Sequence, residues 1–174
     1  TNPVNKVLEI DSFGLSIIKE QPEMISVCGM LNKVIVYNNE SAQNKKIDIN
    51  FDNRSTRCVI RADRTYLFQI FENLISNALK FSFVGTQIHI IVSNDEDYIK
   101  VKIADQGPGI LPEEEEKLFK KFTKLSARPT AGENSTGLGL SQVKRYVELS
   151  NGKVWYEGKQ SIGATFVVQF PLIT

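Results

Sequence analysis

The clearest hydrophobic pattern in the chain lies over residues 63–81. Apolar side chains recur there every three or four residues, which is the spacing of one face of an α-helix. Asp63 stands directly before the pattern and is a good N-cap residue. The sequence therefore predicts an amphipathic helix over 63–81 whose apolar stripe packs against a core. The stripe consists of Leu67, Ile70, Phe71, Leu74, Ile75, Ala78 and Leu79.

Short alternating or apolar runs predict the strands of a sheet. Residues 87–93 and 98–104 alternate and are joined by a polar turn at 94–97, which is typical of an antiparallel hairpin. The remaining strands are expected at 15–20, 47–51, 58–60, 153–156 and 164–170.

Three further helices are expected, over 22–44, 112–121 and 138–150. Pro22 suits a first helical position, and the apolar residues that follow it have helical spacing. Residues 1–14 carry Val4, Val7 and Leu8 at the same spacing, so we expect the tail of an upstream helix or a linker there.

The order of these elements predicts the fold class. Strands form mostly hairpins, and helices fall between them rather than after every strand. This favours an α+β two-layer sandwich with helices on one face of a mixed, mostly antiparallel sheet. A chain of 174 residues suits one such domain, which we expect over 15–174.

Composition excludes several classes of protein. The formal charge is +1, so no bulk field attracts the chain to nucleic acid or to a membrane surface. Apolar runs are too short to span a bilayer, and we expect no secretory signal.

Cys28 and Cys58 lack metal-type spacing, and we expect two reduced thiols in a cytoplasmic setting. The domain could also be the cytoplasmic part of a membrane-bound parent.

A polar stripe runs beside the apolar face of the helix 63–81. Asn73, Asn77 and Lys80 lie at positions i, i+4 and i+7, so their side chains share one side of the helix. An asparagine oxygen is a hard, neutral ligand for Mg²⁺, and a lysine can reach a phosphate. The alternative is an ordinary solvated helix surface.

The turn at 105–110 adds a second candidate. Asp105 follows the apolar strand 98–104, and its carboxylate could accept a hydrogen bond from the exocyclic amine of adenine while repelling the carbonyl of guanine. Gly107 and Gly109 would let the backbone approach a flat base. A tight turn with a capping aspartate is the alternative.

Gly137 and Gly139 stand just before the predicted helix 138–150. A glycine turn that leads into a helix presents N–H groups to phosphate oxygens. The chain contains neither GxxxxGK[ST] nor GxGxxG, which excludes a Walker loop and a Rossmann dinucleotide motif.

Taken in order, these segments resemble the ATP-binding domain of sensor histidine kinases. Its fold is shared with topoisomerase, chaperone and mismatch-repair ATPases. The resemblance covers roughly residues 15–174. The matching segments are the N box at 73–81, the first glycine box at 105–109, the F box at 118–122, the second glycine box at 136–140 and the closing strand motif at 163–166.

The resemblance implies a role for each matching position. Asn77 would be the Mg²⁺ ligand, and Asn73 and Lys80 would be the catalytic residues on the phosphate side. Asp105 would bind the adenine amine, with Thr165 supporting it through a water. Residues 123–136 would form a lid over the nucleotide. The whole ATP-binding set would be Asn73, Asn77, Lys80, Phe81, Asp105, Gly107, Gly109, Ile110, Phe122, Lys124, Thr136, Gly137, Leu138, Gly139, Leu140 and Thr165.

Two departures from the family define what the domain is expected to do. The ATPase branches carry a water-activating glutamate where this chain has Asn73, and Glu72 points about 100° around the helix, so efficient hydrolysis is not expected. The only histidine, His89, alternates along a strand and does not resemble a phosphoacceptor. We therefore expect the acceptor on a separate hairpin.

The resemblance therefore implies a histidine kinase catalytic domain that uses ATP and Mg²⁺. Its expected partners are the acceptor and dimerisation hairpin of the parent kinase and, through the parent, a response regulator. We expect no nucleic-acid partner and no direct membrane contact. The alternatives are a serine kinase of the anti-sigma type and a nucleotide-binding interaction module without catalysis.

Overall fold

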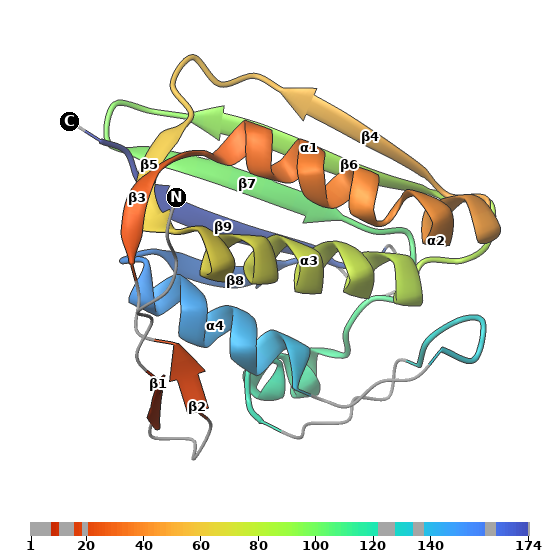
Figure 1. Cartoon of the computed structure of the whole chain (residues 1–174). Helices are drawn as coiled ribbons and strands as arrows, with labels where there is room; N and C mark the ends of the chain where they lie inside the picture. Colours follow the sequence, from red (N-terminus) through yellow and green to blue (C-terminus); the bar gives the residue numbers. More distant parts are fainter. Residues whose placement is uncertain are drawn as a thin grey trace.

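The structure is a computed structural model. It describes residues 21–121, 128–133, 138–158 and 163–173, together with the backbone of two short strands at 8–10 and 16–18. A sheet forms one layer and the helices form the other (Figure 1).

Within the described residues, the main sheet has five strands in the order β4-β6-β7-β9-β8. The β4 and β6 strands are parallel, and every other neighbouring pair is antiparallel. This arrangement confirms the mixed, mostly antiparallel sheet. The strands are β4 (Asp48–Asn53), β6 (Gln87–Asn94), β7 (Tyr98–Ala104), β8 (Lys153–Glu157) and β9 (Thr165–Pro171).

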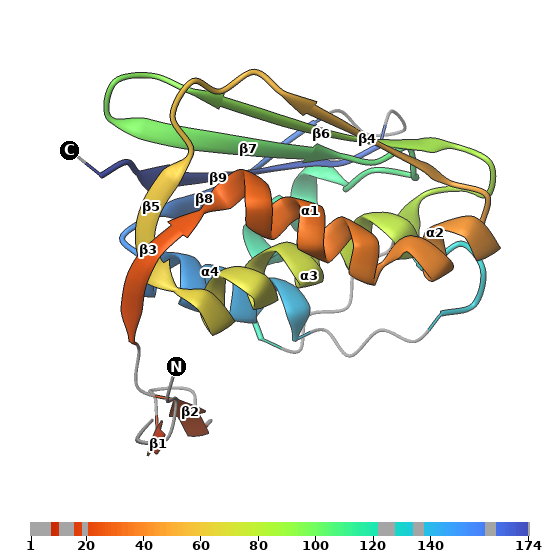
Figure 2. The same ribbon diagram turned by 45° about the horizontal axis from the view of Figure 1, so that its top comes forward.

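The helices lie together on one face of this sheet, as Figure 2 shows. They are α1 (Val27–Tyr37), α3 (Arg64–Phe81) and α4 (Gly139–Leu149), and α2 (Asn39–Asn44) continues the direction of α1. The predicted α+β sandwich is therefore confirmed. In the described part of the chain, no helix is both long enough and apolar enough to cross a membrane.

The α3 helix lies beneath the middle of the sheet and organises the core. Asp63 Oδ1 accepts hydrogen bonds from the N–H groups of Thr65 (2.8 Å) and Tyr66 (3.2 Å), so the predicted N-cap is confirmed. The whole predicted apolar stripe is buried. Phe71 packs edge-to-face against Phe170 of β9, with ring centroids 6.3 Å apart.

The prediction of one helix over 22–44 is wrong at its start. Pro22 opens the strand β3 (Pro22–Ser26), which pairs antiparallel with β5 (Val59–Asp63). The α1 helix begins only at Val27, after the Ser26 hydroxyl caps it by accepting from Gly29 N at 3.0 Å. Pairing with a distant strand outweighed the local preference of Pro22 for a helix start.

The same prediction is also wrong at Asn38, where the helix is interrupted between α1 and α2. The Asn38 side chain donates to Val34 O at 3.0 Å and thereby competes with the backbone for that carbonyl. The predicted helix at 112–121 is a shorter 3₁₀ helix, Pro112–Lys117.

The N-terminal segment contains strands where a helix was expected. Leu8–Ile10 forms β1 and pairs antiparallel with β2, Ser16–Ile18. The helical interpretation is therefore wrong for 8–10, and residues 1–7 lie outside the described part. The strand expected at 15–20 is confirmed by β2.

The two cysteines form a disulfide, so the prediction of reduced thiols is wrong. The β3–β5 ladder brings them together, because Val27 N donates to Cys58 O at 2.8 Å and places Cys28 beside that strand. This long-range contact cannot be read from a spacing of 30 residues. The disulfide also removes one support for a cytoplasmic setting.

Candidate functional site

Three of the segments singled out from the sequence meet along α3. A methyl group placed on the α-carbon of Gly107 would lie 2.1 Å from Phe81 O, so the first glycine turn packs directly on the end of the helix. A methyl group on Gly139 would lie 3.6 Å from Asn73 Oδ1. The start of α4 therefore lies beside the middle of α3, and the predicted neighbourhood is formed.

Asp105 is held rigidly just beyond the end of β7. Its Oδ1 atom accepts hydrogen bonds from the backbone N–H of Ala164 at 2.9 Å and of Gly107 at 3.0 Å. Its own N–H donates to Ala164 O at 2.8 Å. Among the described residues these side-chain bonds all use Oδ1, which leaves Oδ2 available to accept from another donor.

The electrostatic surroundings of Asp105 are unusual for a carboxylate. Burial raises its pKa, and the N–H bonds from Ala164 and Gly107 oppose this effect without cancelling it. A buried carboxylate without a cationic partner, as Asp105 is among the described residues, is a strong acceptor and costs free energy while no ligand donates to it. Such groups are concentrated at functional sites.

Glycine is required at two positions around this carboxylate. At Gly107 any side chain would overlap the backbone of Phe81. Gly163 has φ 104°, and a methyl group on it would lie 2.1 Å from Asp105 O. These close approaches set the backbone around Asp105. Gly109 also has a positive φ, of 75°.

Asn73 carries the strongest indication of a bound group on α3. Its Nδ2 atom is buried and has no hydrogen-bond partner among the described residues. An unsatisfied buried amide costs roughly 1–3 kcal/mol, so such an atom calls for an acceptor. The chemistry suits a phosphate oxygen between α3 and the start of α4.

The other predicted residues of α3 follow Asn73 toward its C-terminal end. Asn77, Lys80 and Phe81 are half-buried, in contrast to the fully covered apolar stripe. They therefore border the core as the polar stripe predicted. The Phe81 carbonyl is the atom against which Gly107 packs.

The second glycine box is only partly described. The α4 helix begins at Gly139, and Leu138 O accepts from Gln142 N at 3.0 Å. No side chain from the described residues caps this first turn. Leu140 packs against the core and Ile110 is buried in it. The predicted residues Phe122, Lys124, Thr136 and Gly137 lie outside the described part of the chain.

The structure places Thr165 differently from the prediction. Thr165 pairs with Ala104 in the sheet, one position away from the buried Phe166, so its side chain lies on the face opposite the core. Ala164, which the sequence analysis missed, makes the contact with Asp105 through its backbone. A backbone contact leaves no mark on residue type, and only the adjacent Gly163 signalled it.

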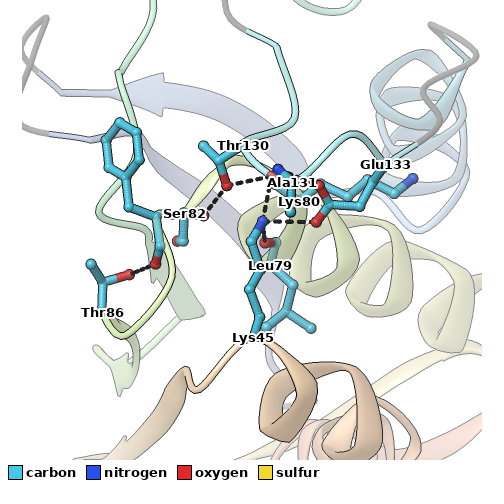
Figure 3. Close-up of polar contacts among 9 residues, drawn as sticks. Lys45, Leu79, Lys80, Ser82, Thr86, Thr130, Ala131 and Glu133 are labelled. Atoms are coloured by element: carbon cyan, nitrogen blue, oxygen red, sulfur yellow. Dashed lines mark hydrogen bonds and ion pairs between the residues drawn. The ribbon is translucent and has the colours of Figure 1, made fainter.

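A contact between distant segments was also missed at the end of α3. Lys45 Nζ donates to the carbonyls of Leu79 (2.8 Å) and Lys80 (2.9 Å), and it forms an ion pair of 2.7 Å with Glu133 (Figure 3). Thr130 donates from its N–H to Lys80 O at 3.0 Å. Nothing in the sequence relates a lysine before β4 to residues that follow the F box.

Comparison with known proteins identifies the class of this fold and site. The model of the family "Histidine kinase-, DNA gyrase B-, and HSP90-like ATPase" matches residues 62–174. The chain therefore belongs to this ATPase family, and it is a catalytic domain of the kind that sensor histidine kinases carry. Membership implies a nucleotide-binding domain.

Individual relatives agree with this assignment. The sensor protein SrrB of Staphylococcus aureus (strain NCTC 8325 / PS 47) is 30% identical over 171 residues, which is 98% of this chain. The chain spans only 28% of the length of SrrB.

Solved structures show the same fold. The catalytic domain of the histidine kinase ThkA has 25% identity and a TM-score of 0.76, with coverage of 87% of this chain and 98% of that one. Full-length ShkA in complex with AMPPNP has 28% identity and a TM-score of 0.77, with coverage of 90% and 32%. ThkA in complex with the response regulator protein TrrA has 25% identity and a TM-score of 0.73, with coverage of 87% and 42%.

Proposed function

We propose that this domain binds Mg-ATP and transfers the γ-phosphate to a histidine on a separate acceptor hairpin. The observation that carries the proposal is the buried Asp105 carboxylate, whose Oδ1 is occupied by Ala164 and Gly107 and whose Oδ2 remains to accept. Adenine offers a donor there through its amine, whereas guanine offers a carbonyl oxygen that a carboxylate repels.

The polar residues of α3 suit the phosphate end of the same nucleotide. Asn73 has a buried Nδ2 donor without a partner among the described residues, and it lies beside the start of α4. Lys80 would contribute a positive charge. Asn77 would hold Mg²⁺ through its amide oxygen, and the ion would neutralise phosphate charge.

The residue types favour transfer of phosphate over hydrolysis. Asn73 stands where the ATPase branches have a glutamate, and an amide cannot take a proton from water. The histidine of this chain, His89, lies in β6 between the buried Ile88 and Ile90, so it faces away from the helical layer that carries Asn73. An acceptor must therefore reach the site from outside this sheet.

The partners follow from that requirement. We propose that the acceptor and dimerisation hairpin belongs to the parent kinase and that a response regulator receives the phosphate through the parent. SrrB is described as a sensor protein, and ThkA forms a complex with a response regulator, which supports this view. Because the domain would use ATP, we propose that it works in the cytoplasm.

Phosphotransfer to the acceptor hairpin of the parent, supplied in trans, tests the proposal. The wild-type domain should label the hairpin with acid-labile phosphate, and Asn77→Ala should abolish labelling while the domain stays folded. Asn32→Ala, at an exposed position of α1, is the matched control and should label normally. Acid-stable label would instead indicate a serine kinase, and wild-type transfer by Asn77→Ala would exclude Asn77 as the metal ligand.

A further inference from the structure

Lys45 is a buried lysine outside every motif of the nucleotide site. It follows α2, and only 8% of its side chain is exposed. Its ammonium group donates to Leu79 O, Lys80 O and Glu133 Oε2, at distances of 2.7 to 2.9 Å (Figure 3). An ammonium has three donors, so all of them are used.

Residues 128–133 are bound to the same place by further contacts. Thr130 N donates to Lys80 O at 3.0 Å, and Thr130 Oγ1 donates to Ser82 O at 2.5 Å. Glu133 uses its second oxygen to accept from Ala131 N at 2.8 Å, which fixes its side chain toward Lys45. The segment 128–133 is therefore docked on the C-terminal end of α3.

The same helix end also contacts the first glycine turn. Ser82 is fully buried, and its hydroxyl accepts from Gln106 N at 3.3 Å. Gly107 packs against Phe81 O. Residues 80–82 thus contact both the segment 128–133 and the turn that carries Asp105.

A purely structural role would explain only part of this arrangement. The last carbonyls of a helix lack partners within the helix and form its negative end, so a lysine there stabilises α3. Capping does not require Glu133, however, which lies 88 residues away and belongs to the segment between the F box and the second glycine box. The ion pair connects the helix end specifically to that segment.

We propose that Lys45 is a positioning residue for the nucleotide site, which it serves by docking the segment 128–133 onto the end of α3 through Glu133. This inference rests on the proposed ATP binding. Lys45 does not touch the nucleotide; it fixes the backbone of Lys80 and keeps the segment 128–133 beside that lysine.

The test compares Lys45→Met, Glu133→Gln and the double variant with the wild type. Lys46→Met is the matched control, because it makes the same change at the adjacent, exposed position. Calorimetry measures the Kd for Mg-ADP well below the unfolding temperature, and hydrogen exchange reports on the amides of 128–133. Thermal unfolding shows which variants are folded.

We expect each single variant to raise the Kd for Mg-ADP by about tenfold. A change of this size corresponds to losing part of the stabilisation that one charge-assisted hydrogen bond provides. The double variant should raise it no further, because both changes break one pair. Exchange in 128–133 should become faster in all three, and Lys46→Met should match the wild type.

If the wild type binds Mg-ADP, two different results would overturn the proposal. If the variants unfolded at lower temperatures but kept the wild-type Kd for Mg-ADP, Lys45 would serve only to cap the helix. If the two single substitutions had independent effects, so that their factors on the Kd multiplied in the double variant, Lys45 and Glu133 would not act as a pair. If the wild type itself failed to bind Mg-ADP, the proposed function would fall together with this inference. Glu133→Gln, on a surface segment, keeps the test decisive should Lys45→Met not fold.

Discussion

The backbone N–H of Ala164 donates a hydrogen bond of 2.9 Å to Asp105 Oδ1, although 59 residues separate the two in the chain. The antiparallel pairing of β7 with β9 brings them together, because Ala104, the last residue of β7, is opposite Thr165, the first residue of β9. Asp105 and Ala164 are the next residues beyond this pair. The sheet register thus places the carboxylate. Gly107 and Gly163 allow the close backbone approaches around it. We propose that the free oxygen of this carboxylate accepts a hydrogen bond from a base amine.

The cost of burying Asp105 predicts a conflict between stability and binding. Burial raises its pKa in the folded chain. A carboxyl with a raised folded pKa adds stability below its unfolded pKa and loses that contribution as pH rises through the folded value. Asp105→Asn avoids the buried charge and keeps an oxygen for Ala164 and Gly107. We therefore expect this variant to unfold at a higher temperature than the wild type at neutral pH.

The pH dependence provides the control for that prediction. The advantage of Asp105→Asn should shrink as the pH falls below the ordinary range of an aspartate, since both chains are then neutral at this position. Thermal unfolding scans from pH 3 to pH 8 measure the difference. A variant less stable than the wild type at neutral pH would mean that the charged hydrogen bonds outweigh burial.

The contact between Gly107 and Phe81 predicts a sharp effect of one methyl group. Gly107→Ala would place a carbon 2.1 Å from Phe81 O, so the turn and the end of α3 must separate. We expect a loss of about 2–4 kcal/mol in the free energy of unfolding, together with loss of nucleotide binding. Urea unfolding measures the first quantity.

Gly139→Ala is the matched control for this substitution. A methyl group there would make an ordinary contact of 3.6 Å with Asn73 Oδ1 and lies in the first turn of a helix, so stability should change little. Equal stabilities for the two variants would show that the close approach at Gly107 does not constrain the turn.

The position of His89 predicts that the isolated domain does not phosphorylate itself. Its side chain lies on the sheet face opposite the helices, and β6 is paired on both edges, with β4 and β7. It cannot reach a phosphate beside α3 unless the sheet opens. Incubation with radiolabelled ATP should give no acid-labile label on the chain alone. Label that disappears in His89→Ala would contradict this account.

Residues whose environment is local could be predicted from the sequence, and those placed by distant strands could not. Asp63 and the apolar stripe of α3 depend on neighbours within the helix, and both were predicted correctly. Pro22 was misassigned because its pairing partner, β5, lies some 40 positions further along the chain. The Cys28–Cys58 bridge depends on the same ladder and was missed for the same reason.

The candidate site divides in the same way. Asp105, Gly107 and Asn73 could be singled out because the chemistry of a carboxylate, a glycine and an amide is visible in residue type. Thr165 was assigned from the resemblance to the family, whereas in the structure the backbone of its neighbour Ala164 contacts Asp105. Lys45 was missed because only the folded chain shows that its ammonium is buried at the end of α3.

We propose that Asp105 selects adenine, and calorimetry on the wild-type domain with Mg-ATP and Mg-GTP measures this selectivity. We expect Mg-ATP to bind and Mg-GTP to bind poorly. Asp105→Asn should lose roughly 1–3 kcal/mol of ATP affinity, the range for a spoiled buried hydrogen bond, while remaining folded. Equal affinity of the wild type for ATP and GTP would contradict the account.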